Sequence, residues 1–159
     1  MSDIRADIHN SGINELRSCS IKISAPAAEV FKVISTPGLH SEIDGSKTVK
    51  GVNWGPERLS LGAKFGMQMK IGVPYKITNI VVDYKENELI AWRHLGRWVW
   101  RYELKSLSPN ETLVTESFDA RPSHLKWWLN MRKAYPSAEK SMAKTLVKLK
   151  VYCESATKQ

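Results

Sequence analysis

Three titratable side chains in the sequence have the type and setting for acid–base chemistry: Glu116, His94 and His40. Glu116 alternates with Val114 and Phe118, so these three side chains share one face of a predicted strand. A carboxyl group on an apolar face has a raised pKa and could act as a general acid or base. The alternative is exposure at a sheet edge, because the register of the last hairpin is open.

The two histidines lie beside predicted turns. His94 precedes a Leu-Gly turn, where a solvated histidine is the common case. His40 follows the first predicted helix and lies close in sequence to Asp44, near the mouth of the predicted pocket. There it could gate the pocket or transfer a proton, although we prefer a surface position. We assign no catalytic residue and keep Glu116, His94 and His40 as candidates.

Other chemistries lack their sequence signatures. The four histidines (9, 40, 94 and 124) and two cysteines do not have zinc-ligand spacing. Neither a G-x-S-x-G elbow nor a glycine-rich phosphate loop is present. We therefore expect neither a metal nor a cofactor.

Aromatic residues gather around one predicted hairpin. If residues 95–97 form a three-residue loop, Trp92 pairs with Trp100 and shares a face with Trp98; a two-residue loop pairs Trp92 with Val99 instead. We prefer the longer loop because it aligns a whole apolar face. That face would hold Ile90, Trp92, Trp98, Trp100, Tyr102 and Leu104.

Methionines extend this apolar face. Met67 and Met69 alternate with polar residues and should point inward with Phe65, while Met142 lies on the last predicted helix. Methionine adapts its shape to an apolar guest, although ordinary core packing explains these residues equally well. The predicted ligand-binding residues are Phe65, Met67, Met69, Trp92, Trp98, Trp100, Tyr102, Glu116, Phe118 and Met142.

These residues must be positioned by a predominantly antiparallel framework. Alternation predicts a first strand at 17–24, and the motif Ser24-Ala25-Pro26 starts a helix capped by Ser24 or Ala25 that ends at 36–38. A short helical turn follows at 39–43. Six more strands are predicted at 47–53, 63–71, 75–84, 88–94, 98–107 and 112–118. Turns, including 72–74, separate them.

The period changes after the last strand. Ala138, Met142, Leu146, Leu149 and Cys153 mark one face of a long helix that starts near residue 136. Residues 122–135 form either a short helix or an ordered loop.

Together these elements predict an α+β fold: a curved antiparallel sheet of about seven strands gripping a long C-terminal helix, with one or two short helices after the first strand. One helix cannot fill such a sheet, so a cavity is expected between them. We expect one domain over 1–159, with 1–15 as a loose N-terminal arm.

The order and spacing of five motifs resemble the START-like superfamily, also called the SRPBCC or helix-grip group, which includes polyketide cyclase/dehydrase proteins and the birch pollen allergen. The motifs are 21–31 (IKISAPAAEVF), 62–65 (GAKF), 90–93 (IAWR), 100–104 (WRYEL) and 112–116 (TLVTE). The resemblance covers residues 17–155. It implies a pocket for a hydrophobic ligand, with cyclisation or hydration in some members and binding alone in others.

The formal charge of +8 is concentrated near the C-terminus. Residues 121–159, which include Lys158, hold nine Lys or Arg and two acids, whereas residues 1–120 have a net charge of +1. The lysines at 140, 144 and 148 are best read as the solvated face of the last helix. The alternatives are an anionic surface, including peripheral membrane contact, or a dimer contact through Val147 and Val151. Nucleic acid is not favoured.

The N-terminus is polar, and no long apolar stretch follows it. A signal peptide and a membrane span are therefore not expected, and two distant cysteines do not form a secreted framework, so a cytoplasmic protein is the default. We expect a monomer or homodimer that binds a small hydrophobic or aromatic molecule. The alternatives are an enzyme of the polyketide cyclase/dehydrase type in the same cavity, or an anionic-surface protein acting through 121–150.

Overall fold

A computed structural model describes residues 3–157; the ends of the predicted 1–159 domain, including Lys158, lie outside this range. Its elements are β1 (Asp7–Asn10), β2 (Leu16–Ile23), α1 (Ala27–Ile34), the 3-10 turn η1 (Pro37–Leu39), α2 (His40–Ile43), β3 (Val49–Trp54), β4 (Lys64–Ile71), β5 (Val73–Lys85), β6 (Leu89–Arg93), β7 (Val99–Ser108), β8 (Glu111–Asp119), α3 (Lys126–Met131) and α4 (Ala134–Thr157).

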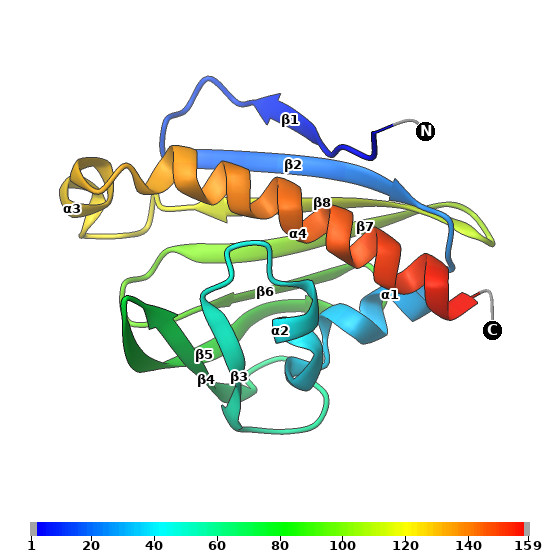
Figure 1. Cartoon of the computed structure of the whole chain (residues 1–159), viewed down its shortest axis with the longest axis horizontal. Coiled ribbons are helices and arrows are strands. Elements are labelled where there is room, and N and C mark those ends of the chain that lie inside the picture. Colours follow the sequence, from blue (N-terminus) through cyan, green and yellow to red (C-terminus); the bar gives the residue numbers. More distant parts are fainter. Residues whose placement is uncertain (1–2, 158–159) are drawn as a thin grey trace.

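The eight strands of the described chain form one open antiparallel sheet in the order β1-β2-β8-β7-β6-β5-β4-β3. Figure 1 shows the long helix α4 lying along the sheet, with α1 and α2 near its C-terminal half. The α+β fold class with a gripped C-terminal helix is confirmed. Apolar side chains from the inner face of the sheet, α1 and α4 form the core.

The sheet has one more strand than predicted because β1 belongs to it. Its residues pair with β2, for example Ile8 with Cys19. The expectation of a loose arm over 1–15 is therefore wrong for this stretch. Four exposed residues show no apolar pattern from which pairing could be read. Backbone hydrogen bonds and a contact between His9 Nε2 and Ser20 Oγ at 2.6 Å attach this edge strand.

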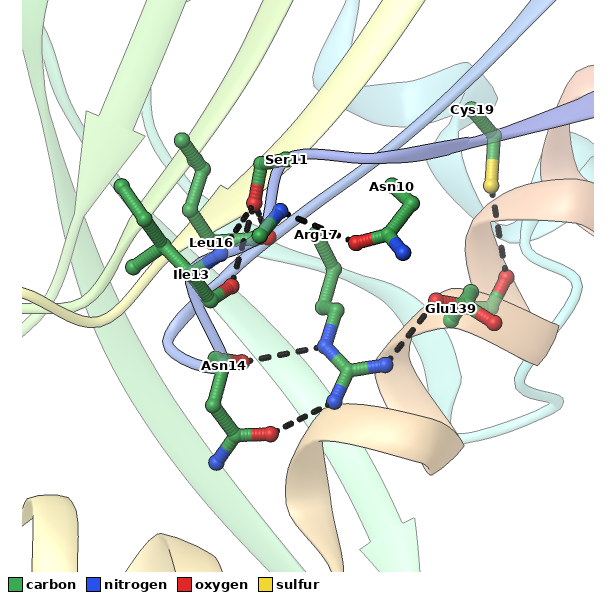
Figure 2. Close-up of polar contacts among 9 residues, drawn as sticks. Asn10, Ser11, Ile13, Asn14, Leu16, Arg17, Cys19 and Glu139 are labelled. Carbon is green, nitrogen blue, oxygen red and sulfur yellow. Dashed lines mark hydrogen bonds and ion pairs between the residues drawn. The ribbon is translucent and has the colours of Figure 1, made fainter.

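Side-chain hydrogen bonds fix the loop that joins β1 to β2 (Figure 2). Ser11 Oγ donates to the carbonyl oxygen of Leu16 at 2.8 Å. Arg17 donates to Asn14 Oδ1 at 2.7 Å and to Glu139 Oε2 on α4 at 3.1 Å. The sulfur of Cys19 lies 3.6 Å from the carbonyl oxygen of Glu139. Helix α4 is therefore tied to β2, the second strand of this hairpin.

The predicted helices form with small shifts at their ends. The N-cap of α1 is Pro26 rather than Ser24 or Ala25, and its side chain makes no capping bond. Helix α4 begins at Ala134, which places Pro136 in its first turn, where a missing N–H leaves no bond unmade. The buried stripe of α4 is as predicted: Ala138, Met142, Leu146, Leu149 and Cys153.

The structure defines one segment that the sequence left open and shortens one predicted turn. The segment 122–135 contains a short helix, α3, as one of the two alternatives had it. The predicted turn 72–74 is shorter than expected: Ile71 pairs with Val73 across Gly72 alone, whose φ of +71° suits glycine. In the described chain, no helix combines the length and apolarity needed to cross a membrane.

Candidate functional site

A cavity of about 660 Å³ lies between the sheet and α4, as the fold predicted. This volume falls within the range of roughly 300 to 1,000 Å³ that is usual for small-molecule sites. All ten residues predicted to bind ligand line it: Phe65, Met67, Met69, Trp92, Trp98, Trp100, Tyr102, Glu116, Phe118 and Met142. The structure brings these side chains together; ligand binding by them stays a prediction.

The β6–β7 hairpin has the three-residue loop that aligns its tryptophans. Trp92 pairs with Trp100, and the N–H of Arg97 donates to the carbonyl oxygen of His94 at 3.0 Å. Arg97 has a φ of +62°, which closes the loop. Trp92 and Trp98 therefore line the same cavity, and the preferred facing of this hairpin is confirmed.

Aromatic rings form much of the cavity wall. Trp100 contacts Phe118 with ring centroids 4.7 Å apart, and Trp92 contacts Tyr102 at 5.6 Å. Trp128 of α3 stacks on Trp98 at 6.5 Å and extends the wall to the α3 end. Flat apolar surfaces of this kind favour an apolar or aromatic guest.

Glu116 points into this wall from β8. Only 4% of the residue is exposed, so the alternative of an exposed sheet edge is wrong. The pKa of its carboxyl group is raised to about 8: burial has the largest effect, a hydrogen bond with Tyr102 opposes it, and the nearby Asp44 carboxylate adds to it. Among residues 3–157, no group hydrogen-bonds Glu116 Oε2. The carboxyl group is therefore mostly protonated at neutral pH and has one oxygen available to a guest.

Tyr102 is the polar partner of this carboxyl group. The register places Tyr102 directly opposite Glu116 on the adjacent strand. Burial, followed by the charge of Glu116 and their hydrogen bond, raises the pKa of the Tyr102 hydroxyl well above its usual value. The Tyr102 hydroxyl therefore stays protonated and donates a hydrogen bond to the carboxyl group of Glu116.

His40 is buried, and the preferred surface position is wrong. Only 8% of the residue is exposed, and its ring stacks on Trp92 with centroids 5.1 Å apart. Its Nε2 lies 2.7 Å from the carbonyl oxygen of Ile34, to which it donates. This carbonyl lies in the last turn of α1, where helical partners run out. Burial lowers the pKa of His40, so the imidazole is neutral.

His94 is half-buried in the cavity wall, so the expectation of a solvated histidine is also wrong. Its ring meets Trp98 edge-on at 4.3 Å, and its Nδ1 accepts the N–H of Gly96 at 3.2 Å. Burial lowers the pKa of His94. The remaining nitrogen, Nε2, is then the protonated one and can donate.

The sequence analysis missed several lining residues. Asn79 is buried and shares the parity of Ile77 and Val81 on β5, a signal that was available in the sequence. Asp44 was placed near the pocket mouth from the sequence and does line the cavity; its effect on Glu116 was not predicted, because it depends on how α2 packs. Thr145 faces inward yet has a structural role, because its Oγ1 accepts the N–H of Gly45 at 2.9 Å.

Both cysteines are buried, and neither is in a disulfide. Burial raises the pKa of each thiol to about 12. The lysines 140, 144 and 148 are exposed, which confirms that they form the wet face of α4. Val147 packs partly against the core, while Val151 is exposed.

Sequence comparison finds relatives without an assigned role. No protein-family model matches the chain. An uncharacterized protein of Mycobacterium tuberculosis, Rv0088, is 48% identical over 103 residues, which are 64% of this chain and 46% of that protein. A counterpart from a second strain, MT0096, is 47% identical over the same length. The chain spans about half the length of the curated relatives it matches.

The open sheet, the gripped α4 and the cavity between them define a helix-grip fold, the fold that the START-like resemblance of the sequence predicted. Solved structures share it: a polyketide cyclase-like protein of Corynebacterium glutamicum has a TM-score of 0.63 at 19% identity and covers 89% of this chain and 93% of its own. An AHSA1-like protein of Aeromonas hydrophila gives 0.58 at 17%, covering 89% and 95%. Protein NE0264 of Nitrosomonas europaea gives 0.69 at 12%, covering 95% and 100%.

Proposed function

We propose that the protein binds a small hydrophobic or aromatic molecule in the cavity between its sheet and α4. The observation that carries this proposal is an aromatic and methionine-lined space of about 660 Å³ that contains a buried carboxyl group with an unpartnered oxygen. Apolar burial supplies affinity, and isolated polar groups orient the guest.

The polar groups favour a particular kind of guest. At neutral pH the protonated carboxyl of Glu116 can donate from Oε2, because Tyr102 already donates toward the group. His94 can donate from Nε2 at the other end of the wall. A guest with an apolar body and a carbonyl or similar acceptor oxygen satisfies these donors.

Native mass spectrometry of the protein as purified tests this proposal. We expect a fraction of the protein to retain a small apolar molecule that separates on denaturation. The proposal fails if the protein is always bare and takes up none of a panel of neutral aromatic ketones and phenols. Glu116→Gln should weaken the binding of the ketones more than the binding of the matched hydrocarbons. A primary amide is a poorer hydrogen-bond donor to an acceptor oxygen than a carboxylic acid.

The second candidate is an enzyme of the cyclase or dehydrase type. The observation that favours it is the same Glu116, since a pKa of about 8 near neutral pH suits a group that gives and takes protons. An enclosed apolar space can also fold a flexible chain toward ring closure. A β-hydroxy ketone of matching size should then lose its hydroxyl group and an α-hydrogen as water with the wild type, and should stay intact with Glu116→Gln although both proteins bind it.

A further inference from the structure

Three chain segments that meet at one end of the molecule contain cations and no acidic residue. These segments are 70–76, 94–98 and 121–133. Arg121 forms an ion pair with Asp119, with Nη2 and Oδ2 2.8 Å apart. The other cations of these segments are Lys70, Lys76, Arg97, Lys126, Arg132 and Lys133. We call the surface of these three segments the mouth face.

The mouth face also exposes large apolar side chains. Trp127 and Met131 on α3 are each 67% exposed, and Val73 at the tip of the β4–β5 hairpin is 70% exposed. Leu95 projects fully into solvent from the β6–β7 loop. Exposed apolar residues gathered in this way on one surface mark an interaction site.

Contacts join the three segments into one surface. Arg97 lies 3.1 Å from His124 Nε2, which links the β6–β7 loop to the segment before α3. Burial raises the pKa of the Tyr75 hydroxyl on the β4–β5 hairpin, and the positive charge of Arg132, which follows α3, opposes this shift, so the two side chains are neighbours. Figure 1 shows α3 and the β4–β5 hairpin at the same end of the molecule.

The cavity opens on this surface. Its exposed lining residues are Ile71 and Tyr75 on the hairpin, and Arg132 and Ser137 around the start of α4. The opening therefore lies between the β4–β5 hairpin and the α3–α4 junction, within the mouth face and at its edge.

We propose that the mouth face docks on the surface of an anionic lipid bilayer. Exposed Trp, Met, Val and Leu side chains would enter the interface, and the surrounding lysines and arginines would contact anionic headgroups. The inference goes beyond guest binding, because it assigns a surface and a partner. It places the cavity opening against the bilayer, so that an apolar guest passes between the two without crossing water.

The composition of the mouth face favours lipid over other partners. The core of a protein–protein interface is depleted in charge, especially Lys, whereas each of these segments mixes cations with its apolar tips. A nucleic-acid surface uses stacking rings, and the aliphatic tips Val73, Leu95 and Met131 offer no such face.

The electrostatic part is tested by co-sedimentation with vesicles of phosphatidylcholine, with and without phosphatidylglycerol. Lys70→Glu/Lys76→Glu/Lys126→Glu reverses three mouth-face charges. The control, Lys105→Glu/Lys140→Glu/Lys144→Glu, reverses three exposed charges elsewhere. Each cation near an anionic surface contributes about fivefold to binding, so the loss of three cations alone weakens binding on the order of a hundredfold, and the three new carboxylates should weaken it further. The control should stay close to wild type. Equal binding of the two variants would overturn the proposal.

The apolar part is tested with Val73→Ala/Trp127→Ala/Met131→Ala, which truncates exposed side chains and should leave the fold intact. We expect this variant to lose most of its vesicle binding at a salt concentration where the wild type still binds. Absence of wild-type binding at low salt, or unchanged binding by this variant, would overturn the proposal. So would a wild-type dimer that the same variant converts to a monomer, or RNA binding without vesicle binding. Because native mass spectrometry reports the guest separately, a failure here leaves guest binding intact.

Discussion

Tyr102 and Glu116 lie directly opposite one another on β7 and β8, and both side chains line the cavity. The pair holds two exchangeable protons at neutral pH, because burial raises the pKa of both groups. Tyr102 donates toward Glu116, whose own proton can then face the guest. A polar contact point beside the aromatic rings of the cavity wall follows from this register.

The pH dependence of the free energy of unfolding should show the raised pKa of the buried Glu116 carboxyl group. The unfolded chain releases the Glu116 proton near pH 4.5, whereas the folded protein keeps it until about pH 8. The unfolded state therefore binds fewer protons in this window, and Glu116 lowers the free energy of unfolding as pH rises, by at most about 1.4 kcal/mol per pH unit. Urea unfolding from pH 5 to 8 should show this slope, and Glu116→Gln should remove it.

Glu57→Gln is the matched control for this series, because Glu57 is exposed in the loop before β4. Its pH dependence should follow the wild type. A Glu116→Gln variant whose unfolding free energy runs parallel to the wild type at every pH would show that Glu116 is ionised in the folded protein.

His40→Phe separates ring stacking from hydrogen bonding. The new ring can still lie on Trp92, but the carbonyl oxygen of Ile34 loses its donor. An unpaired buried acceptor costs about 1–3 kcal/mol, and we expect that loss in chemical unfolding at pH 7.

The same substitution should change the acid limb of stability. Burial lowers the pKa of His40 in the folded protein. As pH falls below about 6.5, the His40 imidazole therefore becomes protonated in the unfolded chain while it stays neutral in the folded one. Wild-type stability therefore falls on that side, and His40→Phe should flatten this contribution. The exposed His124→Phe is the control; an equal effect from both would contradict the role of His40.

The β6–β7 loop depends on the absence of a side chain at Gly96. A Cβ there would collide with the Trp98 ring, so Gly96→Ala must displace this part of the cavity wall. We expect a loss of about 1–3 kcal/mol and a changed near-ultraviolet dichroism. At Gly38 a Cβ meets open space, so Gly38→Ala should behave as wild type. Indistinguishable spectra for the two variants would disprove the collision.

Periodicity was sufficient to predict the sheet, the stripe of α4 and the aromatic face, because those features follow from alternation along single elements. The pairing of Trp92 with Trp100 was predictable for the same reason: only one loop length aligns all the apolar residues. Glu116 was ambiguous, since its facing depends on pairing with Tyr102 in a neighbouring strand.

Features that depend on contacts between separate segments of the chain could not be predicted from the sequence. His40 is buried because a helix-terminal carbonyl and the Trp92 ring meet it, and neither adjoins it in the chain. Strand β1 is held by backbone pairing, by the contact of His9 with Ser20 and by the loop contacts of Arg17, none of which leaves an apolar pattern in the sequence. The mouth face arises only when three separate segments converge.

The most direct test of guest binding is a titration with the neutral fluorescent probe N-phenylnaphthylamine. Ala138→Phe and Ser141→Phe each place a ring in the cavity from α4, whereas Ser155→Phe places one on an exposed part of the same helix. Circular dichroism verifies that each variant is folded. We predict saturable binding by the wild type and Ser155→Phe, and at least about tenfold weaker binding when the cavity is filled. Equal probe binding by all folded variants, or none by the wild type, would contradict a ligand cavity between the sheet and α4.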